Sequence, residues 1–430
     1  MSCMLLEALV TEADPYSPVT LAVVGAGNRG RQYAGIAVAS GRARVVAIAE
    51  PDASRREAAA REYGVSADAV FDDWAALAAA PKIADAVIIA TQDRQHVGPA
   101  VALAEAGYHI LLEKPIAPTE EESLAIVAAA ERASVQLAVC HVLRYTPLTR
   151  LVRDVLDAGR LGELVSIQHL EPVGWWHFAH SYVRGNWRRS DLATPMLMAK
   201  ACHDLDWLQY IVGRPALRVS SFGGLYHFRP TQAPPGAATR CIECPVEDAC
   251  AFSAVRLYRS CLGDPDRERW PLSTVTDTLT VEGVDKALRE GPYGHCVYHN
   301  DNDALDHQIV NIEYEGGVTA SFTVSAFTPM ADRKTRIMGT RGYLETDGET
   351  IRVYDFLTAT EQIIEVGAGT DASAARGHGG GDSGLIDAFL ASITEADASL
   401  IKSGPADSLA SHRVVWAAER ARLEGTVITL

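Results

Sequence analysis

Residues 19–30 read VTLAVVGAGNRG, and this stretch decides the fold. An apolar run that predicts a β-strand, Thr20–Val24, leads directly into the pattern G-x-G-x-x-G. In that pattern the first glycine permits a tight turn, the second lets the backbone approach a pyrophosphate, and the third lets a helix pack against the strand. The helix that follows would point its N-terminal amides at the phosphates. The residues expected to contact a dinucleotide here are Gly25, Gly27, Asn28, Arg29 and Gly30.

A second apolar run, Val45–Ala49, ends in Glu50. An acid about 20 residues after the glycine pattern typically binds the adenosine ribose hydroxyls. Because a carboxylate there would repel a 2′-phosphate, the sequence favours NAD over NADP. Arg55 and Arg56 lie close by and would attract such a phosphate, so we count Arg55 among the cofactor contacts.

Strand-like and helix-like segments continue to alternate to about residue 142, which predicts a doubly wound parallel sheet. The segments after the first two strands are 53–63, 84–91, 96–107, 109–112, 120–133 and 135–140. In such sheets ligands bind beyond the carboxyl ends of the strands. The polar residues expected at that edge are Thr91, Gln92, His96, Glu113 and Lys114.

Composition limits the function classes. The chain has 430 residues, 48% of them hydrophobic, and a formal net charge of −16, which argues against nucleic acid as a partner. No apolar run approaches the ~20 residues of a membrane span. The first twenty residues carry Glu7, Glu12 and Asp14 and no basic region, so they do not resemble a signal peptide, and we expect a cytoplasmic protein.

Five segments match one known family: GAGNRG, ATQDRQH, AGYHILLEKP, CHVLRYTP and KACHDLDWL. With them the chain resembles the glucose–fructose oxidoreductase and inositol dehydrogenase (Gfo/Idh/MocA) superfamily over most of its length. The resemblance implies that Lys114 lies near the nicotinamide and the reacting hydroxyl, where it assists proton transfer or orients the substrate. It also implies a sugar-like substrate, with Tyr145 of CHVLRYTP among its contacts.

The chain departs from the family pattern at one position. Family members carry an aspartate four residues before a histidine that matches His203, but here that position holds Ala199, with Lys200 beside it. We therefore expect either that Lys200 has a direct catalytic role, or that Asp204 or Asp206 orients His203. A purely structural role for His203 is the alternative.

Residues 169–191, HLEPVGWWHFAHSYVRGNWRRSD, crowd histidine, tryptophan and arginine together. Aromatic and cationic side chains in one segment suit a sugar or anion pocket, although a surface loop is the plainer interpretation. The expected substrate contacts in this segment are His177, His180, Arg184, Trp187 and Arg188. A later segment, GHGGGD, is similar to one that lines the sugar site in NAD-dependent glycosidases of the superfamily, which adds His378. A flexible linker with an N-cap aspartate is the alternative there.

A cysteine cluster stands in residues 229–300, a segment that we interpret as an insertion. The spacing Cys241-x2-Cys244-x5-Cys250 is typical of a tetrahedral zinc site, and four thiolates would make that site structural. Related sequences favour Cys296 as the fourth ligand, with Cys261 as the second choice. Because the insertion shows little apolar periodicity, zinc would replace a missing core. Free thiols or a disulfide are the alternatives.

The resulting prediction has two domains. Residues 1–142 form a dinucleotide-binding Rossmann domain, and residues 143–430 form an α+β domain with a large, mostly antiparallel open sheet. Hairpin turns are expected at 315–317 and 347–348, and a last helix, 407–423, should pack back on the first domain. In the family the open sheet often forms a subunit interface, so we expect a homodimer or homotetramer.

Three functions remain open from the sequence. The first is an NAD-dependent dehydrogenase that acts on a ring carbon of a sugar, sugar acid or cyclitol. The second is an NAD-dependent glycosidase that oxidises the sugar transiently, eliminates the leaving group and returns the hydride. The third is a sensor that binds NAD without turnover, which the missing aspartate at position 199 suggests.

Overall fold

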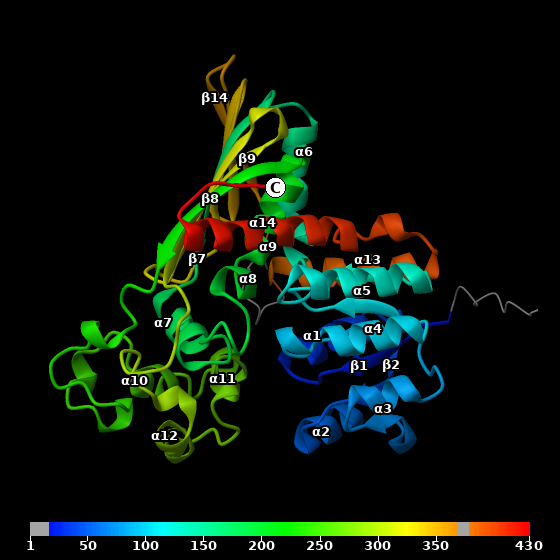
Figure 1. The fold of residues 1–430 in the computed structure, drawn as a ribbon, viewed down its shortest axis with the longest axis vertical. Coiled ribbons are helices and arrows are strands. Elements are labelled where there is room, and N and C mark those ends of the chain that lie inside the picture. Colours follow the sequence, from blue (N-terminus) through cyan, green and yellow to red (C-terminus); the bar gives the residue numbers. More distant parts are fainter. Residues whose placement is uncertain (1–16, 368–377) are drawn as a thin grey trace, which may run out of the picture.

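The computed structural model describes residues 17–367 and 378–430, and the first sixteen residues, where no export signal is expected, lie outside them. Two sheets organise the molecule (Figure 1). The N-terminal sheet lies with its helices at one end, the large sheet stands at the other, and the 229–300 insertion lies beside the N-terminal part. Among the described residues, none of the helices combines the length and apolar character needed to cross a membrane.

The N-terminal sheet is a six-stranded parallel sheet in the order β3-β2-β1-β4-β5-β6. Its strands are β1 Val19–Val24, β2 Ala43–Ala49, β3 Val70–Phe71, β4 Ala86–Ile89, β5 His109–Leu112 and β6 Leu137–Val139. Its helices are α1 Asn28–Ala39, α2 Ala53–Tyr63, α3 Trp74–Ala79, α4 Val97–Glu105 and α5 Glu120–Ala133. This confirms the predicted doubly wound sheet, whose central strands are apolar throughout because helices cover both faces.

The C-terminal sheet has nine strands in the order β14-β13-β12-β11-β7-β10-β9-β8-β15. All described neighbours pair antiparallel except β7 and β10, which are parallel, so the prediction of a large, mostly antiparallel sheet is confirmed. Its strands are β7 Leu164–Pro172, β8 Ala216–Gly224, β9 His307–Tyr314, β10 Thr319–Ser325, β11 Lys334–Gly339, β12 Gly342–Thr346, β13 Thr350–Asp355, β14 Thr360–Glu365 and β15 Ile428–Thr429.

The C-terminal part also contains helices, some of which pack against the N-terminal part. They are α6 Pro147–Asp157, α7 Trp175–Phe178, α8 Met196–Ala199, α9 Cys202–Val212, α13 Gly381–Thr394 and α14 Pro405–Glu424. Helix α14 packs against β8 and α9 of the C-terminal sheet and also against α5 of the N-terminal part (Figure 1). Helix α13 packs on α1. The two parts of the chain are thus joined by helices that come late in the sequence.

The insertion contains three short helices, α10 Ala254–Arg259, α11 Pro265–Arg269 and α12 Val281–Glu290. It has a small apolar core of its own, contrary to the expectation that a metal must replace a missing one. The buried residues of that core are Cys241, Ala254, Tyr258, Cys261, Leu272, Val284 and Leu288. Periodicity failed to reveal this core because α10 and α11 are too short to show it.

Candidate active site

A cleft of about 2060 Å³ runs between the glycine turn, the C-terminal sheet and the insertion. Its walls bring together residues that are far apart in the sequence. From the N-terminal part it is lined by residues that include Gly27, Asn28, Arg29, Asp52, Arg55, Thr91, Gln92, Glu113 and Lys114. From the rest of the chain it is lined by residues that include Glu171, His177, His180, Tyr182, Trp187, Lys200, His203, Trp270, Tyr293, Arg333 and His378.

The glycine turn has the space that a pyrophosphate needs. A Cβ at Gly27 would meet no atom within 4 Å, whereas a Cβ at Gly25 would lie 2.6 Å from the Ala90 carbonyl oxygen, and one at Gly30 would lie 2.0 Å from that of Gly25. Gly25 also has a φ of +89°, which favours glycine. No side chain caps the N-terminus of α1, so its amides are free for an anion. The turn therefore fits a dinucleotide.

The Glu50 carboxylate stabilises this turn through hydrogen bonds to the backbone. Its carboxylate accepts hydrogen bonds from the backbone N–H groups of Ala26, at 2.8 Å, and Asp52, at 3.0 Å, and the residue is only 5% exposed. Asp52 and Arg55 line the cleft, and Glu50 does not. The structure thus places Glu50 against the backbone of the turn and leaves Asp52 as the acid that faces the adenosine end.

Arg29 links the glycine turn to the end of β5. Its guanidinium donates to Glu113 at 2.8 Å and to Asp382 at 2.9 and 3.0 Å, and it lies 4.3 Å from the centre of the Tyr33 ring. His378 and then Arg29 keep the pKa of Asp382 below its usual range against the effect of burial, and Arg29 keeps the pKa of Glu113 low in the same way. Glu113 is therefore a buried anion that fastens the turn.

Lys114 is fixed by the backbone that follows it. The peptide bond between Lys114 and Pro115 is cis. The His96 ring nitrogen Nδ1 lies 2.8 Å from the Pro115 carbonyl oxygen, and His412 on α14 accepts a hydrogen bond of 3.1 Å from the Ile116 N–H. His96 therefore lies beneath the cleft, where it holds the Glu-Lys-Pro turn. The proline and these two histidines give Lys114 a defined position.

The Lys114 ammonium points at the end of α8. Its Nζ atom donates a 2.7 Å hydrogen bond to the carbonyl oxygen of Ala199, the position where the family carries aspartate. His203, 6% exposed, lines the same part of the cleft. Burial, and then the charge of Lys114, lower the pKa of His203 well below its usual range. A cation and a neutral imidazole thus lie together, a pairing that can bind a hydroxyl and accept its proton.

Lys200 enters a second ionic group in the cleft. Its Nζ atom lies 2.8 Å from Glu171, and Glu171 lies 3.1 Å from Arg333. Arg333 also pairs with Asp204 at 2.5 Å. The Asp204 carboxylate lies 3.0 Å from the Nε2 atom of His169. Arg333 holds the pKa of Asp204 below its usual range despite burial. Asp204 is therefore engaged by Arg333 and His169 and is not placed to orient His203.

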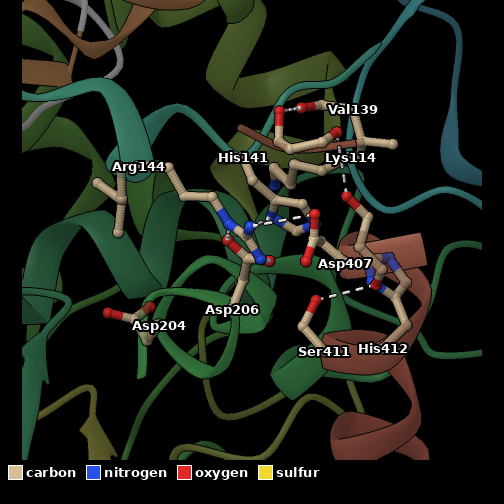
Figure 2. Close-up of polar contacts among 12 residues, drawn as sticks. Lys114, Val139, His141, Arg144, Asp204, Asp206, Asp407, Ser411 and His412 are labelled. Atoms are coloured by element: carbon tan, nitrogen blue, oxygen red, sulfur yellow. Dashed lines mark hydrogen bonds and ion pairs between the residues drawn. The ribbon is translucent and has the colours of Figure 1, made fainter. Parts of the chain in front are cut away.

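Asp206, the other acid considered for His203, is engaged as well. Arg144 donates to it twice at 2.7 Å, and the pair is buried (Figure 2). His141 lies beside the pair, with Nδ1 3.8 Å from Asp206, and its ring lies 5.9 Å from that of His203 and 5.4 Å from that of His412. Within residues 17–367 and 378–430, the buried Nδ1 of His203 has no hydrogen-bond partner. No carboxylate among the described residues therefore orients His203.

The structure divides the expected substrate residues. His177, His180, Trp187 and His378 line the cleft, and the other three expected residues do not. The Tyr145 hydroxyl lies 2.9 Å from the Ser403 hydroxyl, and Arg188 pairs with Asp301 at 2.7 Å on the surface. Arg184 is 1% exposed and donates to the carbonyls of His295 and Phe252 inside the insertion. These three are occupied by the protein itself.

His378 closes the cleft near His203. Its Nδ1 lies 3.0 Å from Asp382, and its ring lies 5.8 Å from that of His203. Burial lowers the pKa of His378, while the Asp382 carboxylate opposes that shift. Asp382 thus orients His378 and receives Arg29, so the segment 378–382 belongs to the site.

The four cysteines proposed as metal ligands lie around one cavity, but their side chains are not arranged as a metal site. Cys241, Cys244, Cys250 and Cys296 line one small cavity, whereas Cys261 lies in the insertion core, with its thiol donating to the Leu257 carbonyl at 3.2 Å. Across residues 17–367 and 378–430, no group of three or more His, Cys, Asp or Glu side chains could hold a metal ion. Zinc is therefore not supported by this geometry.

Several residues of the site carried no signal in the sequence. Arg333 stands in the loop before β11, and Trp270 and Tyr293 lie in the insertion, none of them within a recognisable motif. Glu171 was visible only as part of a polar segment. Their roles depend on how the strands of the C-terminal sheet and the insertion surround the cleft, which no local pattern encodes.

Two models of one oxidoreductase family cover nearly all of the described chain. Residues 19–141 match the NAD-binding Rossmann fold of the Gfo/Idh/MocA oxidoreductases, and residues 153–430 match their C-terminal alpha/beta domain. The Rossmann match agrees with the open glycine turn, and the second match spans the residues that complete the cleft.

Individual relatives are more distant. Inositol 2-dehydrogenase of Corynebacterium glutamicum (strain R) is 31% identical over 200 residues, which are 46% of this chain and 55% of that protein. D-glucoside 3-dehydrogenase of Escherichia coli (strain K12) is 27% identical over 47% of this chain and 56% of its own length. The chain thus aligns with about half the length of each. An oxidoreductase from Agrobacterium radiobacter, crystallised with NAD+, L-tartaric acid and magnesium, shares the fold with a TM-score of 0.69 at 17% identity, covering 96% of this chain and 98% of that one.

Proposed function

The chain belongs to the Gfo/Idh/MocA oxidoreductase family, and from this premise we propose that it transfers hydride between NAD and a ring carbon of a sugar, sugar acid or cyclitol. One observation carries the proposal: Lys114, held on the Ala199 carbonyl, and neutral His203 meet in the cleft that the glycine turn opens into. The two dehydrogenase relatives that act on inositol and on a glucoside support the substrate class.

The residues divide the work of oxidising a secondary alcohol. NAD, held by the glycine turn at Gly25, Gly27 and Gly30, would supply the acceptor for the hydride of the carbinol carbon. The Lys114 ammonium, with one donor committed to Ala199, has donors left to bind the substrate oxygen. His203 lines the same part of the cleft as Lys114, and its neutral imidazole is the group placed to receive the hydroxyl proton as the C=O bond forms. Hydride and proton leave to separate acceptors, so the reaction balances as alcohol to ketone.

NAD is the favoured cofactor in this proposal. Asp52 lines the adenosine end of the cleft, so a 2′-phosphate would meet its carboxylate, and the buried Glu50 lies just behind it. Arg55 also lines the cleft, but Arg31, the other cation there, is paired with Glu62. The negative charges of Asp52 and Glu50 at this end of the cleft therefore disfavour binding of a 2′-phosphate.

The test is formation of NADH by purified protein with D-glucose, methyl glucosides, glucuronate and myo-inositol. Lys114→Ala and His203→Asn should each lower kcat/KM by ~10²-fold or more, while Lys286→Ala, an exposed lysine on α12, should leave it unchanged. NAD binding without turnover of any of these compounds, unaffected by Lys114→Ala, would instead identify a sensor.

A glycosidase that uses NAD without net turnover is the alternative that one observation favours. His378, oriented by Asp382, lies beside His203 and supplies a further imidazole at the site. Such a base could remove the proton next to a transient ketone before the leaving group departs. Release of p-nitrophenol from p-nitrophenyl glucosides with no accumulation of NADH would establish this activity, and stoichiometric NADH would exclude it as the main reaction.

We also propose that Cys241, Cys244, Cys250 and Cys296 bind zinc once their sulfur atoms draw together. The support is electrostatic. Arg184 is 1% exposed, its Nη1 has no hydrogen-bond partner in the described part of the chain, and its Nη2 lies 3.5 Å from the Cys241 sulfur. Four thiolates on Zn²⁺ carry a net charge of about −2, which would compensate this buried cation.

Metal analysis of the purified protein tests this. We expect about one zinc per chain, lost in Cys250→Ser and kept in Cys261→Ser, whose sulfur lies in the insertion core. Native protein that contains no zinc and gains no thermal stability from added Zn²⁺ would end the proposal.

A further inference from the structure

One wall of the cleft is aromatic and is built largely by the insertion. The Trp270 ring lies 4.9 Å from that of His177, 5.3 Å from Trp176 and 5.7 Å from His180. The Tyr293 ring stacks on His180 at 4.9 Å with an interplanar angle of 16°. Of these rings, His177, His180, Trp270 and Tyr293 line the cleft. We call these four residues the aromatic wall.

The aromatic wall is held in place by hydrogen bonds and carries no charge. His180 Nδ1 lies 2.8 Å from the Tyr258 hydroxyl, and its Nε2 lies 3.3 Å from the Thr274 hydroxyl, so both ring nitrogens have partners within the insertion. Burial lowers the pKa of His180 to about 3, which keeps the ring neutral. A rigid, uncharged aromatic surface is suited to the apolar C–H face of a sugar ring.

The wall adjoins the ionic part of the cleft but differs from it in chemistry. His177 lies where the aromatic wall meets the ionic part. Its ring lies 4.9 Å from that of Trp270. Burial, and then the charge of Lys200, lower the pKa of His177. On the ionic side, Lys200 and Arg333 each lie within salt-bridge distance of Glu171. Beyond His177 the lining includes the rings of His180, Trp270 and Tyr293, together with Thr274 and other small side chains of the insertion. A substrate that used both regions would need a polar reacting part and an uncharged, flat-faced extension.

The cleft is also large for a single small ring. Binding pockets for small molecules typically measure about 300–1,000 Å³, whereas this cleft measures about 2060 Å³. The glycine turn and Asp52 mark the region for a dinucleotide, and Lys114 and His203 mark that for the reacting ring. The aromatic wall remains as a third region with no assigned occupant.

We propose that the aromatic wall binds a second sugar ring, so that the preferred substrate is a glycoside of at least two rings, oxidised in the ring that reaches Lys114 and His203. This inference rests on the proposed function and specifies its substrate class. A monosaccharide would fill the reacting position and leave the wall without contact.

The test measures binding and turnover separately. Calorimetry on the protein loaded with NAD+ compares cellobiose and maltose with D-glucose, and NADH formation is followed with the same sugars. We expect at least one disaccharide to bind about 10-fold more tightly than D-glucose. Trp270→Ala should remove most of that difference, and Trp270→Phe should keep it. Trp175→Ala is the matched control, because Trp175 is 39% exposed and does not line the cleft.

The outcomes separate the second-ring inference from the proposed dehydrogenase function. Equal affinity for one and two rings, no binding of either disaccharide, or an equal loss for all sugars in Trp270→Ala would overturn the second-ring inference, even where D-glucose is oxidised. Conversely, selective disaccharide binding without NADH formation from any sugar would support the aromatic wall and count against the proposed dehydrogenase. Thermal melting of each variant shows whether the fold is intact.

Discussion

At the scale of single residues, the site depends on charges that are buried in compensating groups. Glu113, Asp382 and Arg29 form one such group, and Glu171, Asp204, Lys200 and Arg333 form another. Neither group follows from a motif, although Glu113 and Lys114 were expected at the sheet edge. The missing family aspartate is replaced by a backbone carbonyl, that of Ala199, which receives Lys114 without adding a charge.

Arg29 should therefore be essential for stability as well as for cofactor binding. Arg29→Ala leaves two buried carboxylates without their cation, and removing one partner of a buried pair costs roughly 3–5 kcal/mol. Urea unfolding at pH 7 measures the loss. At pH 5 the loss should be smaller, because Glu113 and Asp382, no longer held ionised by Arg29, can take up protons. An equal loss at both pH values would contradict this account.

Two glycines of the turn should respond differently to alanine. A Cβ at Gly30 would lie 2.0 Å from the Gly25 carbonyl oxygen, so Gly30→Ala should destabilise the protein. A Cβ at Gly27 meets nothing, so Gly27→Ala should fold with nearly unchanged thermal stability and lose affinity for NAD about 10-fold or more, because the methyl group enters the space of the pyrophosphate. Normal NAD affinity in Gly27→Ala would place the cofactor elsewhere.

At the scale of elements, the sequence predicted helices and turns well where capping residues or glycines mark their ends. Helix α5 spans Glu120–Ala133 as expected, because Thr119 and Glu122 form a capping box, and α2 begins after the N-cap Asp52. The hairpin turns at 315–317 and after Thr346 also lie where glycines predicted them. The insertion was predicted less well, because its helices are short and its core residues are contributed one or two at a time.

Helix α14, which lies far along the chain, should help to hold the Glu-Lys-Pro turn in place. Its His412 accepts a hydrogen bond from the Ile116 N–H, and both groups are buried. His412→Ala leaves that N–H without a partner, which costs about 1–3 kcal/mol. The same change should lower kcat by releasing Lys114, with less effect on the affinity for NAD. Arg413→Ala is the neighbouring control, because Arg413 pairs with Glu120 on the surface. An unchanged melting temperature in His412→Ala would argue against this link.

At the scale of the whole molecule, buried neutral histidines should set the response to acid. Burial lowers the pKa of His180 and of His412 from 6.5 to about 3, and that of His141, His177 and His203 well below its usual range. The unfolded chain binds protons near pH 6.5 while the folded chain does not. Stability is therefore full above pH 6.5 and falls as the pH drops below it.

Between pH 7 and pH 5.5 each of these histidines should remove roughly 1 kcal/mol of unfolding free energy. Carboxyl groups, with ordinary pKa values near ~4, contribute little in that interval. Urea titrations at the two pH values measure the difference. Replacing the exposed His299 with asparagine should leave the difference unchanged. Equal stability at the two pH values would show that these histidines are accessible to protons.

The sequence by itself determined the dinucleotide-binding half, because a glycine turn, an acid and alternating strands are local features with fixed spacing. It also placed Lys114 and His203 as residues of one site, through their resemblance to a family pattern. Only the tertiary structure decided what surrounds them: the Ala199 carbonyl that receives Lys114, the Arg333 that binds Asp204, and the aromatic wall. These contacts join residues that are tens to hundreds of positions apart, and their distances are set by the packing of two sheets and an insertion, which no single segment of the sequence specifies.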